Sequence, residues 1–570
     1  MKRFSVSARG GTQDVIGKKL RSAIACHQQN QFPEAGRLYE QILKLDPDHF
    51  DALQYLAAIR IQSGNFQDAE ILFGRAIRVN GASPVLHSNY GSVLHELGRF
   101  ADAVASYERA LALQPVYAEA SYNLGNSLCA LDRFDEAIIS YKKALDAKPA
   151  YAEARYNLGN AYQKCHRFEE AIASYDGALA SAPKYALAHL NRGNALRELR
   201  RHDEAIASYD RAIQHKSDFA EAFSNRGGVL KDLKRFDEAM ASYFKALSIN
   251  PNDAEVYWNT GLMLLLLGNF KDGFEFYEWR KKIKEPLGNR LFPRPLWLGR
   301  ESLEGKRILI HEEQGIGDII QFCRYVTLLD AQGAHVIFAV APRLLGLMAT
   351  LGGSIEIRSI DEAATDFDFH CPLLSLPRAF NTELTNIPAH TPYLSADQAR
   401  TQSLRHQLLE HGTKKICGVS WFSKNASTGK SRSVGLPGLF KHMDADDYIF
   451  VNLQYGDVSQ EIADLKAQHG VEIISLPTID NFGDIDGFAA LVEACDVVVT
   501  IDNTTAHIAG ALNKKTFLML PYVPDWRWML DRADSPWYPT VRLLRQTTDG
   551  DWSPVFRAVK DALREAVEPA

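Results

Sequence analysis

The stretch "YNLGNAYQKCHRFEEAIASYDGALASAP", residues 156–183, carries the pattern that decides the first half of the fold. Gly159 is followed by Ala171, Tyr175 and Pro183. A shift of 34 residues repeats the small residue, the alanine and the aromatic residue, and proline closes five of the units. Small residues let two helices approach closely, the aromatic residue is expected to wedge between units, and proline ends the second helix. The small residue recurs at Ala23, Ala57, Gly91, Gly125, Gly159, Gly193, Gly227 and Gly261.

This period resembles the tetratricopeptide repeat. We predict eight units over residues 16–284, preceded by a flexible N-terminus at residues 1–15. Such repeats stack into an all-α superhelix whose extended concave face binds a protein or peptide. The first half of the chain is therefore expected to bind a protein partner.

A ladder of asparagines runs through the repeats, two positions before each central glycine. An amide can donate to and accept from a peptide backbone, so this ladder predicts a binding surface for an acceptor protein. The alternative is that asparagine is common at this repeat position and only satisfies neighbouring backbone. The ladder resembles, in architecture, the superhelix of the eukaryotic O-GlcNAc transferase. Its members are Asn89, Asn123, Asn157, Asn191, Asn225 and Asn259, with second asparagines at Asn126, Asn160 and Asn194.

The pattern changes after a basic, proline-interrupted linker at residues 285–301. Short β-branched runs such as "RILIHE", "ICGVSW" and "DVVVTID" alternate with helical stretches, which predicts parallel sheets with crossover helices. We assign a first lobe to residues 302–395 and a second to residues 396–570. Two Rossmann-like lobes facing a cleft describe the GT-B glycosyltransferase architecture.

The segment "EEQGIGDIIQF", residues 312–322, starts like a dinucleotide-binding turn but has isoleucine where a third glycine would stand. Gly315 and Gly317 are followed directly by Asp318. A carboxylate at this helix N-terminus would repel a pyrophosphate and suits a general base that takes a proton from an acceptor hydroxyl. The alternative is an aspartate that merely caps its helix. His311 is the next candidate for the base.

A candidate donor site follows two strands of the second lobe. The turn "DNTTAH" places Asp502, Asn503, Thr504, Thr505 and His507 at a helix N-terminus, whose free N–H groups can bind an anion. The loop "FSKNASTGKSRSVG" should overhang the same edge, and its cations suit a phosphate leaving group. The alternatives are an ordinary N-cap and a solvated loop. The cations of the loop are Lys424, Lys430 and Arg432.

Together these motifs resemble the heptosyltransferase-like family of glycosyltransferases (family 9), which has a GxGD turn with a catalytic aspartate and a D-T-G-x-x-H turn. Asn503 and Thr504 replace the threonine and glycine of the second motif. The segments "HCPLLSLPRAF" and "PDWRWMLDRADSPWYPT" are similar to a bacterial subgroup that fuses tetratricopeptide repeats to this domain. That subgroup includes soluble flagellin glycosyltransferases, which attach nonulosonic sugars to serine or threonine.

The resemblance implies a single inverting displacement with Asp318 as the base, a nucleotide-activated sugar as the donor, and neither an essential metal nor another cofactor. In the second segment, Trp526, Trp528 and Trp537 either stack on a base or sugar or form a packed corner between the lobes.

Composition limits the possible partners and the cellular compartment. The net charge of −6 gives no general attraction to nucleic acid or anionic membranes. Seven cysteines without a CxxC pair are typical of buried thiols in a reducing compartment. The N-terminus lacks an apolar signal core, and the longest apolar run is too short to span a membrane. These features predict a cytoplasmic protein.

Three functions follow from these patterns. The first is a soluble protein O-glycosyltransferase whose repeats capture the acceptor, with flagellin as a candidate. The second is a glycosyltransferase that acts on lipopolysaccharide or another glycan, for which eight repeats are an unusual addition. The third is a non-catalytic repeat scaffold. A transfer assay separates enzyme from scaffold, and a comparison of protein and glycan acceptors separates the two enzymes.

Overall fold

The protein is described by a computed structural model that covers residues 5–283, 292–362, 365–425, 429–443 and 447–567. It divides into two compact units, Met1–Ile249 and Asn250–Ala570. Part of the predicted linker, residues 284–291, lies outside the described residues, as do residues 1–4 of the predicted flexible N-terminus. Helix α1 begins at Ser5, so the described part of that N-terminal segment is helical.

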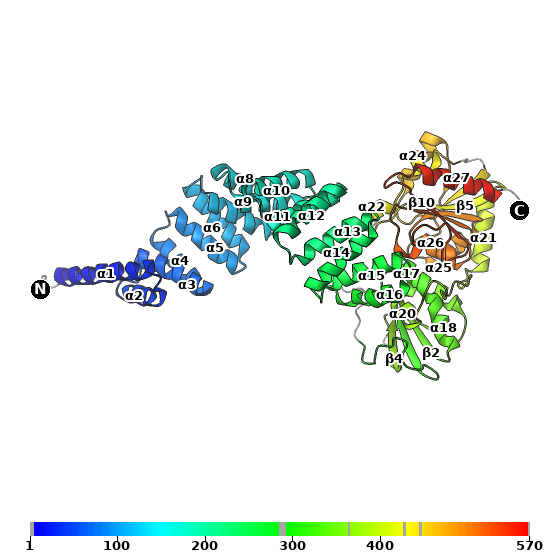
Figure 1. Cartoon of the computed structure of the whole chain (residues 1–570), viewed down its shortest axis with the longest axis horizontal. Coiled ribbons are helices and arrows are strands. Elements are labelled where there is room, and N and C mark those ends of the chain that lie inside the picture. Colours follow the sequence, from blue (N-terminus) through cyan, green and yellow to red (C-terminus); the bar gives the residue numbers. More distant parts are fainter. Residues whose placement is uncertain (1–4, 284–291, 363–364, 426–428, 444–446, 568–570) are drawn as a thin grey trace. The chain divides into compact units, whose positions relative to one another are not determined.

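The first unit consists of antiparallel helix pairs, coloured from blue to green in Figure 1. Each odd-numbered helix packs on the even-numbered helix that follows it, as the 34-residue period predicts. The helices are α1 (Ser5–Gln28), α2 (Phe32–Leu45), α3 (Phe50–Gln62), α4 (Phe66–Val79), α5 (Pro84–Glu96), α6 (Phe100–Leu113), α7 (Ala118–Cys129), α8 (Phe134–Ala147), α9 (Ala152–Lys164), α10 (Phe168–Ser181), α11 (Ala186–Glu198), α12 (His202–His215), α13 (Ala220–Asp232) and α14 (Phe236–Ile249).

The spacing of glycine and tyrosine has a direct steric cause. A Cβ atom on Gly159 would lie 2.5 Å from Cε1 of Tyr175, and a Cβ on Gly125 would lie equally close to Tyr141. The tyrosine of the second helix therefore occupies the space that the missing side chain of the first helix leaves. Both tyrosines are buried. The tyrosine thus wedges between the two helices of one repeat, and the prediction that it lies between units was wrong.

The second unit begins with the last helix pair, α15 (Ala254–Leu266) and α16 (Phe270–Tyr277), and continues into two parallel sheets. The first sheet has the order β3-β2-β1-β4, and the second has the order β10-β9-β8-β5-β6-β7. The strands are β1 (Arg307–His311), β2 (His335–Val340), β3 (Glu356–Ser359), β4 (Phe369–Pro372), β5 (Lys415–Ser420), β6 (Tyr448–Asn452), β7 (Ile473–Ile474), β8 (Val497–Ile501), β9 (Thr516–Leu520) and β10 (Val541–Arg545).

Crossover helices cover both sheets, which confirms an α/β region after the repeats. Helix α18 packs on β2, α26 packs on β8 and β9, and α27 packs on β9 and β10 (Figure 1). The helices of this region are α17 (Ile316–Phe322), α18 (Val326–Ala331), α19 (Leu345–Met348), α20 (Leu376–Ala379), α21 (Gln398–Leu409), α22 (Gly429–Arg432), α23 (Leu436–Phe440), α24 (Ser459–His469), α25 (Ile485–Ala494), α26 (Thr504–Ala511) and α27 (Ser553–Val567).

The last helix pair shares a core with the α/β region. Phe270 stacks on Trp537 with ring centroids 6.0 Å apart, and Phe274 meets Trp526 edge-on at 5.7 Å. All four rings are buried. The sequence pattern assigns this pair to the repeat array, yet its aromatic residues complete the packing of the lobes.

The order of the strands identifies where each sheet can bind a ligand. In the first sheet β1 lies between β2 and β4, and in the second sheet β5 lies between β6 and β8. The strand order therefore changes direction beside β1 and beside β5. Open parallel sheets bind ligands outside the carboxyl ends of their strands at such switch points. The turns after β1, β5 and β8 are therefore the places to look for a site.

Candidate functional site

The turn after β1 carries the predicted base, Asp318. Gly315 is the N-cap of α17, and its backbone N–H donates to Oδ2 of Asp318 at 2.9 Å. Asp318 thus does cap its helix, as the alternative proposed. Gln314 adopts φ 65°, a left-handed conformation that is costly for a residue with a side chain. Its amide exchanges hydrogen bonds with the hydroxyl of Tyr277 from α16, which holds this turn in place.

The turn after β8 is built largely by Asn503, the N-cap of α26. Its Oδ1 accepts from the backbone N–H of Thr505 at 3.0 Å, and its Nδ2 donates to Ser420 Oγ of β5 at 2.7 Å. Thr505 is buried and Thr504 is half-buried. The side chain of Asn503 already accepts a hydrogen bond from a backbone N–H at the start of α26. Fewer of these N–H groups therefore remain for a phosphate.

His507 belongs to the interior of this site. Its Nδ1 lies 2.9 Å from the hydroxyl of Tyr538, and its ring stacks on Trp528 at 5.4 Å. Burial, helped by the charge of Arg527, lowers the pKa of His507 to about 3. The imidazole is therefore neutral at physiological pH and orients its neighbours.

The two turns meet face to face. Helix α17 packs on α26, and a Cβ atom on Gly317 would lie 2.8 Å from Cδ2 of His507. A side chain at position 317 would push the turns apart. The structure therefore brings together the GxGD turn of the first lobe and the DNTTAH turn of the second, which lie almost 190 residues apart in the sequence.

A network of charges fills the junction of the turns. Arg527, which is only 7% exposed, donates through Nη1 to Oδ1 of Asp525 at 2.8 Å and pairs through Nη2 with Oδ1 of Asp318. Arg432 donates through Nη1 to the carbonyl oxygen of Asp502 at 3.0 Å, and the same nitrogen lies 3.1 Å from Asp502 Oδ2 as an ion pair.

The buried Asp502 and the half-buried Asp525 differ in their electrostatics. Burial raises the pKa of Asp502, and Arg432 only partly opposes this effect. Burial would raise the pKa of Asp525 as well, but the charges of Arg527 and Arg432 outweigh it and hold that pKa below its ordinary value. The network therefore holds two arginines, both paired with carboxylates, for which an anionic ligand would compete.

Of the three predicted cations in the loop after β5, the structure places Arg432 at the turn after β8. Lys424 lies over the ring of Tyr455 at 5.9 Å, beside Gly456 in the turn after β6, and Lys430 is exposed. Residues 426–428 of this loop lie outside the described residues. Arg527 and Asp525 are site residues that the sequence motifs did not single out.

A buried ion cluster supports the first turn from behind. The guanidinium of Arg280, fully buried after α16, donates through Nε to Glu313 Oε2 at 3.1 Å and through Nη2 to Ser375 Oγ at 3.0 Å. Glu278 completes the cluster, 2.9 Å from Arg280 Nη1. Burial alone would raise the pKa of Glu278, but Arg280 and Lys281 lower it to about 2. Arg280, which follows the last repeat helix, thus anchors the turn that carries Asp318.

The other candidates lie in packed surroundings. His311 is buried against Phe292 at 4.7 Å and against His370 at 5.7 Å. The three tryptophans of the "PDWRWMLDRADSPWYPT" segment are buried, which agrees with a packed corner and leaves them little exposed face for a sugar. They are Trp526, Trp528 and Trp537.

The asparagine ladder joins neighbouring repeats. Asn157 Nδ2 donates to Asn126 Oδ1 at 2.9 Å and to the hydroxyl of Tyr122 at 3.1 Å. Asn191 repeats both bonds one unit later, and Asn225 repeats the amide bond. The amide N–H groups of these three residues are thus committed within the array.

Asn89 and Asn123 occupy the same ladder position, but the unit before each of them lacks the second asparagine. The preceding units have Ala58 and Ser92 where later units have the second asparagine. In the described part of the chain, the side chains of Asn89 and Asn123 form no such amide bond. Asn259, in the second unit, is half-buried.

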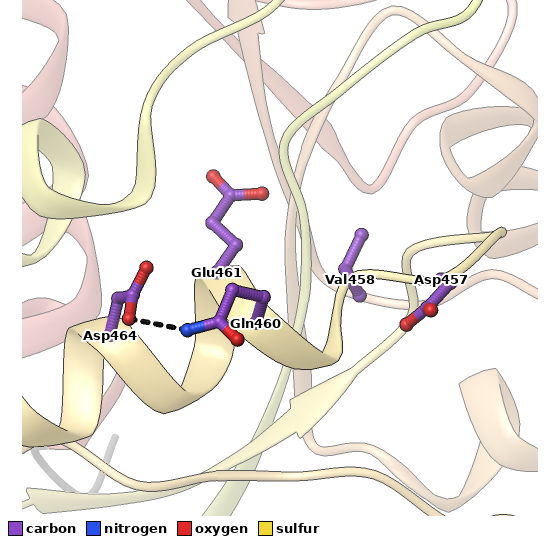
Figure 2. Close-up of a pocket in the computed structure, with 5 residues that line it drawn as sticks. All are labelled: Asp457, Val458, Gln460, Glu461 and Asp464. Atoms are coloured by element: carbon purple, nitrogen blue, oxygen red, sulfur yellow. Dashed lines mark hydrogen bonds between the residues drawn. The ribbon is translucent and has the colours of Figure 1, made fainter.

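Two pockets lie elsewhere. One has a volume of about 380 Å³ and lies at the start of α24. It is lined by Asp457, Val458, Gln460, Glu461 and Asp464 (Figure 2). Its three carboxylates disfavour a phosphate. The other, of about 500 Å³, lies between α2 and α3, with Phe32, Pro33 and Ile59 in its lining. Among the described residues, no helix is long and apolar enough to cross a membrane, and no group of three or more His, Cys, Asp or Glu is placed to hold a metal ion.

Comparison with known proteins agrees with the repeat assignment. Residues 27–88, 91–152, 156–220 and 220–253 match family models of the tetratricopeptide repeat. The chain therefore carries tetratricopeptide repeats. Protein FlbA of Caulobacter vibrioides is 29% identical over 321 residues, which cover 53% of this chain and 53% of that protein. This chain thus spans about half the length of the curated relative that it matches.

Solved structures match part of the chain. The crystal structure of MamA is 27% identical and covers 29% of this chain and 96% of its own, with a TM-score of 0.28. YrrB, described as a TPR protein with an unusual peptide-binding site, is 24% identical and covers 32% and 95%, with a TM-score of 0.30. The C-terminal part of a repeat protein from Cytophaga hutchinsonii is 17% identical and covers 42% and 97%, with a TM-score of 0.37.

Proposed function

We propose that this protein is a GT-B glycosyltransferase that transfers a sugar from a nucleotide-activated donor to serine or threonine of a protein bound by its repeats. The observation that carries the proposal is the meeting of the two turns. Asp318 from the first lobe and Arg432, Asp502 and Arg527 from the second converge where the switch points of two parallel sheets face each other.

The chemistry assigns one step to each group. The acceptor hydroxyl gives its proton to the carboxylate of Asp318 while its oxygen forms a bond to the anomeric carbon of the sugar. The bond between that carbon and the phosphate oxygen breaks, and its electron pair leaves with the nucleotide. In this proposal Arg432 stabilises the departing phosphate, since charge-assisted hydrogen bonds act most strongly in a buried site. Attack opposite the leaving group inverts the anomeric centre.

The repeat array supports a protein acceptor. The first unit, Met1–Ile249, presents a repeating surface that is far larger than a small glycan needs, and tetratricopeptide arrays bind protein segments. The Oδ1 atoms of the ladder can accept from the N–H groups of an extended chain with little regard to its sequence. Flagellin with a nonulosonic acid donor is the first pair to test, because the family resemblance points to it.

The test is a transfer assay with the purified protein. We expect a protein acceptor such as flagellin to gain the mass of one or more sugars, with release of one nucleotide per sugar, when CMP-, UDP-, GDP- or ADP-linked donors are supplied singly. A lipopolysaccharide acceptor under the same conditions should remain unchanged. Transfer to the glycan alone would contradict the protein acceptor, and absence of transfer from every donor would favour a non-catalytic scaffold.

A further inference from the structure

Only one of the two N–H groups with which Arg527 could bind an anion has a partner in the protein. The Nε and Nη2 groups of an arginine form a fork that binds both oxygens of a carboxylate or phosphate. In the repeats this fork is full: Arg133 donates through Nε to Glu136 Oε1 and through Nη2 to Oε2, each at 2.7 Å. Arg527 pairs through Nη2 with Asp318, while its buried Nε–H has no acceptor among the described residues.

The geometry of Asp318 explains why it fills only half of the fork. Its Oδ2 accepts from the backbone N–H of Gly315 at 2.9 Å, and only Oδ1 reaches Arg527. The carboxylate is tied to its own helix and cannot turn to offer both oxygens. A buried guanidinium N–H without an acceptor is costly, so a ligand that supplies two oxygens has an advantage over Asp318.

We propose that Arg527 receives an anionic group of the sugar donor, and that Asp318 occupies this place until the donor displaces it. The inference rests on the proposed function and extends it. When the donor takes the fork, Oδ1 of Asp318 is released while Oδ2 stays on Gly315. The base is therefore free to accept a proton only after the donor is in place, which sets a binding order of donor first and acceptor second.

Two groups of a donor have the required chemistry: the phosphate that links nucleotide and sugar, and the carboxylate of an acidic sugar. Inorganic pyrophosphate and free N-acetylneuraminic acid are probes that separate these sources. Whichever probe responds to the Arg527 variants identifies the group that enters the fork. Titration calorimetry with the full chain measures both without any need for transfer.

The decisive variants are Arg527→Lys, Arg527→Gln and Asp318→Asn. Loss of the fork should weaken binding of the responding probe about tenfold or more in Arg527→Gln. Arg527→Lys should also weaken it, because lysine keeps the charge but has no fork. Asp318→Asn should tighten binding several-fold, since the competitor for Arg527 is neutralised.

The chain offers a matched control pair. Asp496 binds Arg405 at 2.8 Å and accepts from the backbone N–H of Ile416 at 2.8 Å, which copies the two contacts of Asp318, but it lies at the amino end of β8. Asp496→Asn and Arg405→Gln should leave probe binding unchanged.

The inference would be overturned if Arg527→Lys bound both probes as tightly as the wild type, or if Asp318→Asn bound neither probe more tightly. It would also be overturned if neither the wild type nor Asp318→Asn bound either probe. Asp318→Asn retains the buried arginine and so keeps the test valid if an Arg527 variant fails to fold. Transfer with an unchanged donor KM in Arg527→Lys would remove this inference and leave the proposed function. Altered probe binding without any transfer would contradict the proposed function and the role of the donor, and would leave only an anion site at Arg527.

Discussion

At the scale of single residues, the site depends on buried charges whose partners are distant in the chain. Arg280 and Glu313 are both fully buried at their side chains, and they join the end of the repeats to the turn that carries Asp318. A charge in such a position must be paired, because an isolated buried charge is strongly unfavourable. The pair therefore keeps the turn that carries Asp318 at a fixed position relative to the last helix pair.

Arg280→Met should destabilise the second unit by about 3–5 kcal/mol, since it leaves Glu313 buried without its cation. Urea denaturation followed by tryptophan fluorescence reports this unit, because Trp526 and Trp537 lie in its shared core. Arg542→Met removes an exposed pair with Glu565 and should change stability by less than about 1 kcal/mol. Equal stability of both variants would show that the buried cluster does not hold the unit together.

The sequence motifs located Asp318, Asp502 and Arg432 but missed Arg527 and Asp525. The reason is physical: Arg527 meets Asp318 across 209 residues, and no local pattern records such a pairing. One local signal was present. An arginine between two tryptophans in "DWRW" is expected to be buried, and a buried arginine needs a carboxylate partner.

At the scale of elements, the repeats were predictable because their contacts are local. Gly125 and Tyr141 touch within one unit, so the sequence spacing of the motif is also its spatial contact. The buried strands β5, β6, β8 and β9 were predictable as apolar runs. Strand β10, "VRLLR", was missed because arginines interrupt it, and β3 and β4, "EIRS" and "FHCP", are short and polar or end in proline.

The ladder asparagines separate into two groups that a binding experiment can compare. The triple variant of Asn157, Asn191 and Asn225 to Ala should lower the stability of the array, because roughly 0.5–1.5 kcal/mol is lost with each inter-repeat hydrogen bond. The double variant of Asn89 and Asn123 to Ala should leave stability unchanged.

Both variants should weaken capture of the acceptor protein, measured by calorimetry at a temperature where each array remains folded by circular dichroism. If only the triple variant weakens capture, and in proportion to its lost stability, the ladder serves the array alone. If neither variant changes capture, the acceptor binds elsewhere on the repeats.

At the scale of the whole molecule, the chain combines a repeat array with an α/β region that contains its own last repeat. The sequence predicted two kinds of structure and their order along the chain. It placed their boundary after residue 284, whereas the compact units divide after Ile249. Aromatic residues of α16 satisfy the repeat pattern and also pack on Trp526 and Trp537, and a periodic motif cannot show that second role.

The central claim is that the meeting point of the two turns transfers a sugar with Asp318 as the base. The most direct measurement is the rate of mass gain of the acceptor protein with wild type, Asp318→Asn and the control Asp496→Asn at saturating donor. We predict that Asp318→Asn slows transfer by about 10²–10⁴, as is typical of the loss of a general base, while Asp496→Asn transfers at the wild-type rate. Transfer by Asp318→Asn at the wild-type rate would contradict the account.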